Sequence, residues 1–311
     1  MAVMSLRARR ARAGALRRRE AHAGLLFVSP WLFSLLVFTA YPVLATFYFS
    51  FTDYNIIQPP HWTGLQNYAT MVTADTDFWN AVRNSTYYAF IAVPLGLVAS
   101  LALALVLNLR AHGIGIYRTL FYLPVLAPPV AGAFVFLLML DPDNGLINIV
   151  LRAVGLPAPG WFSDPMWSKP GLVLLSLWGL GAGTLIFLAG LQEIPQPLLE
   201  AAMIDGAGAW RRFWHVTLPL LTPVILFNLV MGVIGSFQVF TQALIVGRET
   251  GEPLGSTLMF MMLIYNNAFK YFQMGYASAL SVVLFLAVVL VTLAIFRSSS
   301  AWVHYEAGHR G

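Results

Sequence analysis

The chain has 311 residues, of which 59% are hydrophobic and only 10% charged, with a net charge of +5 and a mean hydropathy of +0.73. A water-soluble globular domain carries about 25% charged residues, so this chain has too little charge to cover a surface that faces water. The composition excludes a disordered chain, a nucleic-acid-coating protein and an ordinary cytosolic enzyme, and it predicts a polytopic membrane protein. The absence of cysteine excludes disulfides, thiolate metal sites and a cysteine nucleophile.

Six stretches of the sequence are long and apolar enough to cross a bilayer as helices, which takes about 20 residues each. None contains Asp, Glu, Lys or Arg, and they lie at 25–50, 84–108, 119–140, 171–192, 216–247 and 276–296. The expected fold is therefore all-α, a polytopic membrane protein with six transmembrane helices. Proline should bend the second and third spans, at Pro94, Pro124, Pro128 and Pro129. The fifth span should break near Gly232 and Gly235.

The spans divide the chain into consecutive regions. They are an Arg-rich tail at 1–24, the first helix at 25–50, an external loop at 51–83, a core at 84–297 that includes a cytoplasmic loop at 193–215, and a C-terminal tail at 298–311. If the first tail is cytoplasmic, thirteen of the 18 basic residues share its side, and eight of the 13 acidic residues lie on the other. Because basic residues favour the cytoplasmic side, we expect both termini in the cytoplasm. A cleaved signal peptide or a nucleic-acid arm fits the tail less well, since the apolar stretch is too long for the first and no aromatic residues interleave for the second.

No predicted span carries an ionisable side chain. This disfavours an ion-coupled carrier and a membrane-embedded enzyme, which need such groups at membrane depth, although backbone carbonyls alone can bind sodium. Lys169 and Lys270 are the only lysines, and neither stands in a phosphate-binding loop. Asp141 and Asp143 belong to a polar turn. The sequence thus offers no catalytic residue, metal ligand or cofactor site. If the protein drives transport, the energy must come from a partner.

The cytoplasmic loop between spans four and five has a recognisable design, QEIPQPLLEAAMIDGAGAWRRFWHVTLPLL from Gln192 to Leu221. Pro197 suits the first turn of a short helix, and Gly206 and Gly208 suit its end. A second short helix follows, with Trp210, Phe213 and Trp214. The helical period places four residues of the first helix on one face: Leu199, Ala202, Met203 and Gly206. The loop either docks on a protein partner or rests on lipid through Trp210, Arg211, Arg212 and Trp214.

One spacing in this loop resembles the EAA loop of ATP-binding-cassette importer permeases. It comprises Glu200-Ala201-Ala202, Gly206, Val216 and Leu218-Pro219, and it departs from the usual pattern only in Val216, where isoleucine is frequent. Further segments are similar to the carbohydrate branch of these permeases, the maltose, trehalose and glycerol-3-phosphate type: YPVLATFYFSFTDYN, WTGLQNYATM, YRTLFYLPVLAPP and WFSDP. The resemblance covers residues 25 to 297 and favours docking over lipid contact.

The resemblance implies a type I importer permease fold in a bacterial-type cytoplasmic (inner) membrane. It implies that the loop is a coupling helix seated in a separate ATPase through Glu200, Ala201, Ala202, Asp205 and Gly206. ATP and Mg²⁺ would bind that ATPase and not this chain. The implied partners are a second, related permease, two ATPase subunits and an external solute-binding protein. The implied function is the transmembrane subunit of an ATP-driven carbohydrate importer, with another small polar solute as the alternative.

A path for sugar should offer hydroxyls, amides and aromatic faces near mid-membrane. The resemblance and the side-chain chemistry together favour positions in spans four and five, of which Gln238 and Trp178 are the strongest candidates. The full set is Ser176, Trp178, Gly183, Asn228, Gly232, Ser236, Phe237, Gln238 and Gln242. Serine and glycine stand where the maltose permeases have larger groups, so maltose itself is a poor fit. Small residues in spans also serve helix packing, which remains the alternative for each position. Tyr265, Asn266 and Asn267 belong either to the external rim or to a solvated loop.

Overall fold

The computed structural model describes residues 23–109 and 111–304; almost all of the predicted Arg-rich tail, Arg110 and residues 305–311 lie outside the described residues. Within these ranges the chain is almost entirely helical, which confirms the all-α prediction. The exception is a short antiparallel pair, β1 (Thr52–Asp53) and β2 (His61–Trp62). It lies in the predicted external loop, together with α3 (Gln66–Thr73).

Four described helices are long and apolar enough to span a membrane unbroken: Ala23–Phe49, Thr76–Leu107, Pro165–Glu193 and Met274–Ser299. Two further spans are bent pairs, Ile114–Leu126 with Pro129–Met139 at 99°, and Ala209–Leu220 with Thr222–Phe237 at 65°. Counted in this way the described chain has six spans, as predicted. All six begin earlier than the apolar pattern suggests. In the second and fourth spans the added turns are capped by Asp75 and Asp164, which accept backbone N–H groups.

The helices, in chain order, have the following bounds. The first span includes η1 (Leu35–Ala40) and α2 (Tyr41–Phe49), and the second is α4 (Thr76–Leu107). Then come α5 (Ile114–Leu126), α6 (Pro129–Met139), α7 (Leu146–Ala153), α8 (Pro165–Ser176), η2 (Leu177–Gly179), α9 (Leu180–Glu193) and α10 (Gln196–Ile204). The rest are α11 (Ala209–Arg212), η3 (Phe213–Thr217), α12 (Leu218–Leu220), α13 (Thr222–Phe237), α14 (Thr241–Gly247), α15 (Phe260–Tyr265), η4 (Asn266–Lys270) and α16 (Met274–Ser299).

The bends differ in part from those predicted. The third span bends where Pro128 and Pro129 follow one another, as expected, but α4 continues through Pro94 and α5 continues through Pro124. The predicted break at Gly232 and Gly235 is wrong, because α13 runs through both and ends at Phe237. A side chain at Gly232 would meet Val93 of α4 at 3.2 Å, so this glycine serves close packing between straight helices.

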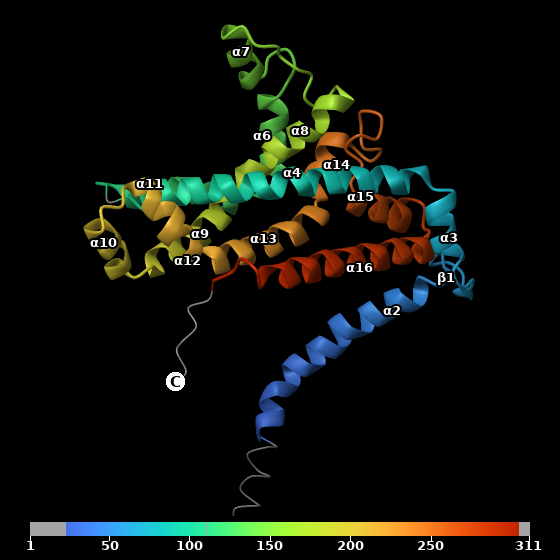
Figure 1. The fold of residues 1–311 in the computed structure, drawn as a ribbon. Coiled ribbons are helices and arrows are strands. Elements are labelled where there is room, and N and C mark those ends of the chain that lie inside the picture. Colours follow the sequence, from blue (N-terminus) through green and yellow to red (C-terminus); the bar gives the residue numbers. More distant parts are fainter. Residues whose placement is uncertain (1–22, 110, 305–311) are drawn as a thin grey trace, which may run out of the picture.

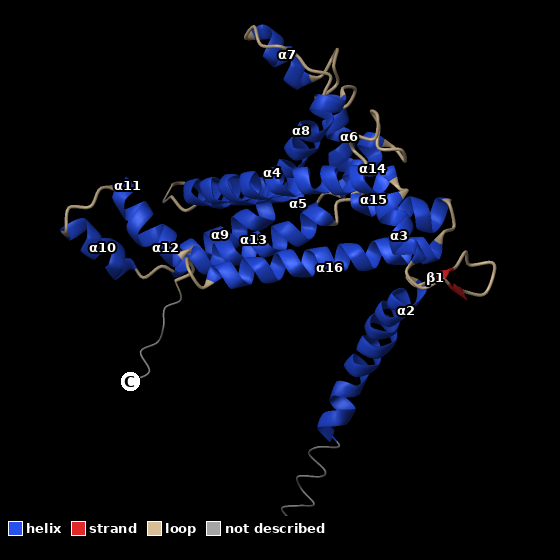
Figure 2. Cartoon of the chain, turned by 45° about the vertical axis from the view of Figure 1, so that its right-hand side comes forward, coloured by secondary structure: helices blue, strands red, loops and turns tan. Residues whose placement is uncertain are grey.

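Helices α4, α9, α13 and α16 form the body of the molecule (Figures 1 and 2). α4 makes its most extensive contacts with α9 and α13, and α13 also packs on α16. One end of the body carries α3 and β1, here called the α3 end, and the other carries α10 and α11, here called the α10 end. The first helix leaves the body at the α3 end, where α2 packs on α16, and no residue of its apolar window is buried.

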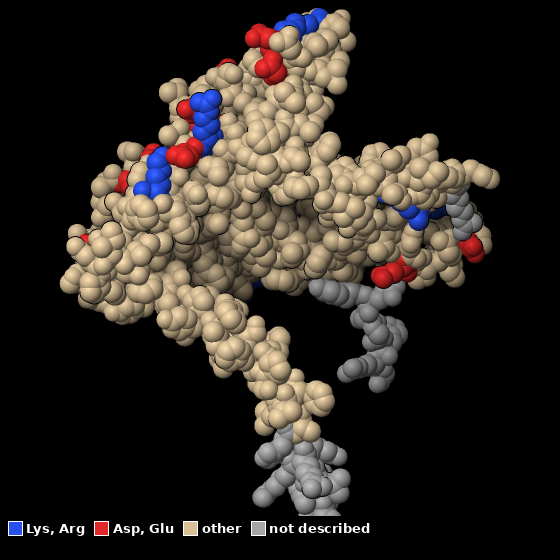
Figure 3. Space-filling view, turned by 180° about the vertical axis from the view of Figure 1, so that it is seen from behind, with Lys and Arg blue, Asp and Glu red and all other residues tan. Residues whose placement is uncertain are grey.

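Charged residues and buried apolar clusters are distributed differently between the α3 end and the α10 end of the body. In Figure 3, acidic and basic side chains gather toward the two ends and the tip of the projecting α6–α8 arm, with an almost uncharged belt between them. The larger buried cluster lies toward the α3 end and includes Phe78, Phe136, Met259 and Leu280. A smaller one, here called the α10-end cluster, comprises Ala104, Phe187, Leu188, Leu191, Ile194 and Leu221. An uncharged belt of this kind is what a hydrocarbon layer requires.

Buried amides fix the loop before α15 to α4. Asn84 is fully buried, and its Nδ2 donates to the carbonyls of Gly255 at 2.8 Å and Leu258 at 3.1 Å. Asn80, one turn earlier, donates to the same Gly255 carbonyl at 2.9 Å. Non-helical backbone at this depth needs such partners, because neither a helix nor water satisfies its carbonyls.

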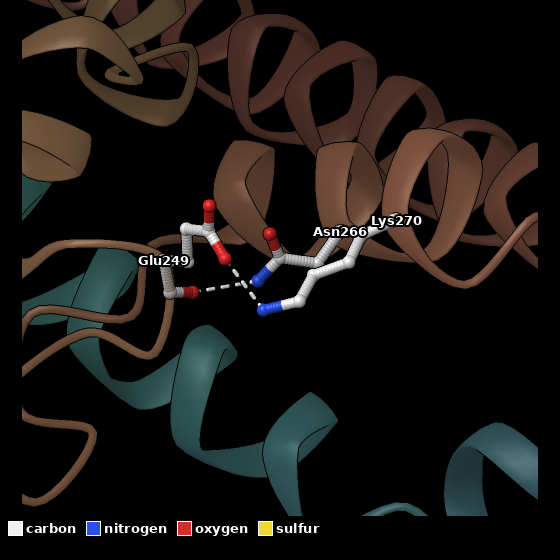
Figure 4. Close-up of polar contacts among 3 residues, drawn as sticks. All are labelled: Glu249, Asn266 and Lys270. Carbon is white, nitrogen blue, oxygen red and sulfur yellow. Dashed lines mark hydrogen bonds and ion pairs between the residues drawn. The ribbon is translucent and has the colours of Figure 1, made fainter.

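Further polar contacts hold the same loop from other sides. Ser85 accepts the N–H of Phe260 at 2.9 Å, and the hydroxyls of Ser168 and Ser256 lie 2.7 Å apart. At the beginning of the loop, the Glu249 carbonyl accepts from Asn266 at 2.7 Å and its carboxylate from Lys270 at 2.6 Å (Figure 4). This hydrogen bond raises the pKa of Lys270. The exposed ion pair itself adds little stability, so the buried contacts fix the loop.

Replacing Asn84 with alanine should destabilise the α3 end, because it leaves the Leu258 carbonyl buried without its donor. We expect a loss of about 1–3 kcal/mol, the cost of one unsatisfied buried group, seen as a lower thermal unfolding midpoint of the detergent-purified protein. Asn80→Ala is the matched control, since Asn84 still donates to Gly255 in that variant. Equal midpoints for the two variants would contradict this role of Asn84.

Candidate functional site

The loop at the α10 end folds as the sequence predicts, into a helix, a glycine turn and a second short helix. α10 begins with Pro197 in its first turn and ends at Ile204. The N–H of Gly206 bonds to the carbonyl of Met203, and that of Ala207 to the carbonyl of Ala202. This is a Schellman ending, in which the residue after the cap is left-handed. Gly206 has φ of +75°, which glycine adopts without strain.

α10 turns one side to the protein and the other to its surroundings. Leu199 and Ala202 are half-buried, and Leu199 packs on the α10-end cluster beside Ile194 and Leu221. The predicted face is therefore split, because Met203 is 49% exposed and Gly206 is exposed as well. Only the first half of this short helix reaches the cluster, so the later residues of the same face, Met203 and Gly206, are exposed.

The outward side of this loop holds the EAA residues and large apolar groups. Glu200, Ala201 and Asp205 are exposed. Ile204 is 88% exposed and Trp210 is 74% exposed. A contiguous apolar surface of this kind marks a contact with a partner or with lipid. The residues that the sequence singled out for docking thus lie together on one accessible surface, apart from Ala202.

A cavity of about 510 Å³ lies in the middle of the body, between the two buried clusters. It is lined by α4, the junction of α8 with α9, α13 and the first turn of α14, and it is open to the surroundings on one side. Its described lining contains no charged side chain. The polar groups that line it are Tyr88, Ser100, Ser176, Asn228, Ser236 and Gln242.

Six of the nine residues predicted for the solute path line this cavity: Ser176, Gly183, Asn228, Gly232, Ser236 and Gln242. The other three lie elsewhere. Trp178 packs on Gly132 and edge-on against Phe136, because η2 turns it away from the Ser176 side. Phe237 packs on the larger buried cluster, and Gln238 is exposed where the helix ends. Of the three rim candidates, Tyr265 is exposed, whereas Asn266 and Asn267 are buried in η4.

Sequence reasoning missed the wall contributed by α4. Tyr88, Ala92, Gly96 and Ser100 follow one another at four-residue intervals and all line the cavity. Such a stripe of small and polar residues within an apolar span signals a face that meets other helices. Read on the second span, it would have identified this wall.

Small residues bring the three walls together. A side chain at Gly183 would meet Ser100 Oγ at 3.1 Å and Asn228 Oδ1 at 3.4 Å. Gly183 therefore lies where α9 contacts both α4 and α13 beside the cavity. A larger residue here would protrude into this contact.

The polar groups of the lining differ in what they offer. Ser100, Ser176 and Ser236 donate their hydroxyl hydrogens to backbone carbonyls, and Asn228 uses its Nδ2 on the Val224 carbonyl at 3.0 Å. Oxygen lone pairs remain on these four side chains, so each can accept a hydrogen bond. Tyr88, Gln242 and the second Nδ2 hydrogen of Asn228 add groups that can donate. The cavity thus suits an uncharged body rich in hydroxyl groups.

Comparison with known proteins agrees with this architecture. The family model described as binding-protein-dependent transport system inner membrane component matches residues 92–304. The probable ABC transporter permease protein YesP of Bacillus subtilis is 44% identical over 292 residues, 93% of this chain and 94% of that protein. The trehalose/maltose transport system permease protein MalF of Thermococcus litoralis is 35% identical, over 89% of this chain and 94% of that protein.

A solved structure shares the fold. A chain of a bacterial ABC transporter involved in the import of the acidic polysaccharide alginate superposes with a TM-score of 0.78, covering 92% of this chain and 98% of that one, at 22% identity. The family match and the two relatives together cover both the cavity and the loop at the α10 end. The chain belongs to the binding-protein-dependent transport system inner membrane component family, the non-enzymatic permease subunits of ATP-binding-cassette transporters.

Proposed function

We propose that this permease imports a carbohydrate, taking the solute through the central cavity. The single observation that carries the proposal is the lining: oxygen acceptors and three donor-capable side chains without charge, at the depth where the apolar belt lies. Sugar hydroxyls can donate to such acceptors, and C–H faces can pack on the exposed ring of Phe227. Relatives whose names specify trehalose/maltose, lactose and arabinooligosaccharide transport support the same class of solute.

The energy for this import comes from partner subunits. We propose that the exposed surface with Glu200, Ala201, Asp205 and Gly206 seats in an ATPase, which binds ATP and Mg²⁺. Leu199 links α10 to the α10-end cluster, which contains Leu191 of α9 and Leu221 at the bend before α13. Because packed cores move as units, a displacement of α10 reaches two walls of the cavity. Glu200 is free to meet a basic group, and Ala201 permits close seating.

The orientation follows from charge. We propose that the α10 end faces the cytoplasm and the α3 end faces outward, with both termini cytoplasmic. Arg118, Arg211 and Arg212 lie toward the α10 end, whereas Asp53, Asp75 and Asp77 lie toward the α3 end. This is the distribution expected for a chain inserted in a bacterial inner membrane.

A complete transporter requires further chains. We propose a second, related permease of different sequence, two ATPase subunits and an external solute-binding protein. The first helix supports a permease partner, since its apolar window leaves the body with none of its residues buried. One chain also contributes one cavity and one loop, which fits a paired arrangement.

The Glu200→Ala variant should weaken attachment to the ATPase. Loss of one charge-assisted contact corresponds to about a tenfold loss in affinity, so we expect less ATPase retained on the affinity-purified permease and slower ATP-driven uptake in proteoliposomes. Glu193→Ala is the matched control, an exposed glutamate outside the EAA motif.

Gly206→Val should act in the same direction by straining the turn, and Gly208→Val, where φ is −65°, should act much less. Unchanged retention and uptake in Glu200→Ala and Gly206→Val would contradict the docking role.

The Asn228→Leu variant should impair solute recognition while leaving the complex assembled. Leucine has a similar volume but no oxygen, so the acceptor beside Gly183 is lost. We expect the solute concentration for half-maximal uptake to rise about tenfold, as for one lost hydrogen bond. Gln238→Leu is the control, because Gln238 lies outside the cavity. An effect confined to Gln238→Leu would place the path elsewhere.

A further inference from the structure

Lys169 occupies an unusual position just outside the cavity. It lies in α8, seven residues before the cavity residue Ser176, which is about 10 Å along a helix. Asn84, its partner on α4, lies one turn before the cavity residue Tyr88. Lys169 therefore stands at the end of the cavity that faces the α3 end, which we propose is the outer entrance.

The ammonium of Lys169 is positioned but not neutralised. Its Nζ donates to Asn84 Oδ1 at 3.3 Å and lies 5.7 Å from the centre of the Tyr87 ring. Asn84 cannot turn away, because its Nδ2 is held by two carbonyls of the loop before α15. Among the residues that the structure describes, no carboxylate lies within 4 Å of Lys169. The other lysine, Lys270, is by contrast paired with Glu249 at 2.6 Å.

A half-buried cation without a counter-ion is costly at the edge of a membrane. An ammonium has three hydrogens, and one of them is used by Asn84. The remaining ones are available to an acceptor. Arg83, adjacent to Asn84 on α4 and exposed, adds a second positive charge to this part of the helix. Both features favour an anionic group as the missing partner.

We propose that Lys169 binds the carboxylate of an acidic saccharide at the entrance, while the hydroxyl groups of the same solute occupy the cavity. This inference rests on the proposed function, since it names the class of carbohydrate. The two regions divide the recognition: a charge-assisted hydrogen bond at Lys169, neutral acceptors at Ser176 and Asn228. A uronate oligosaccharide has both kinds of group.

The test compares an acid with its own neutral form on the assembled transporter in nanodiscs, without binding protein. The probes are digalacturonate and diglucuronate, each measured by calorimetry against its methyl ester. We expect the wild-type complex to bind at least one acid about tenfold more tightly than its ester. Lys169→Gln removes the charge and retains a polar side chain with N–H donors. It should abolish this difference and leave ester binding within about twofold, as expected when no charge is involved.

Two controls separate recognition from structure. Lys270→Gln removes the other lysine at the same end and should leave the acid-to-ester ratio unchanged. Lys169→Arg should retain most of the preference for the acid. Equal binding of acid and ester by the wild type, no binding of either acid, or equal weakening of both forms in Lys169→Gln would each overturn the inference. None of these results would bear on the proposed function. That function is tested separately, by whether ATP-driven uptake of a neutral sugar depends on Asn228.

Discussion

Close approach of three helices at membrane depth is the constraint on which the rest of the structure depends. Lipid gives no hydrophobic drive for helices to associate, so they must pack closely through small residues. Gly232 admits Val93 of α4, and Gly190 admits Val224 of α13, which would lie 3.2 and 2.7 Å from an added side chain. Gly183 joins all three helices. These contacts leave room for the central cavity and connect its walls to the helices that reach both ends.

The charged and polar side chains lie mainly at the two ends of the body, and the described lining of the cavity between them carries no charge. At the α3 end, amides such as Asn84 hold irregular backbone that no helix satisfies. At the α10 end, Leu199 connects an exposed helix to the smaller buried cluster. A neutral cavity between them can accept hydroxyl groups but cannot relay protons or ions along ionisable side chains. The division agrees with the proposed role of this chain as a conduit that a partner ATPase drives.

Much of this organisation could be predicted from the sequence. The six spans follow from apolar length, and the turn at Gly206 follows from helix-ending chemistry, because both are local properties. The positions of Trp178 and Gln238 could not be predicted, since a short 3-10 turn and the end of α13 decide which way they point. Nor could the sequence pattern distinguish a glycine that allows close helix packing from one that ends a helix. Helix α13 runs through Gly232, where Val93 of α4 lies close against it. These outcomes depend on neighbours distant in sequence.

The most direct test of the account is the side from which the cavity can be reached. The natural chain has no cysteine, so Ser176→Cys in the complete transporter, with cysteine-free partners, gives one reactive position in this subunit. In proteoliposomes, a membrane-impermeant thiol reagent should label it from the α10 side without nucleotide and from the α3 side when ATP is trapped. Labelling from one side in both states would contradict the proposal that a displacement of α10 reaches the cavity walls and so opens the cavity to each side in turn.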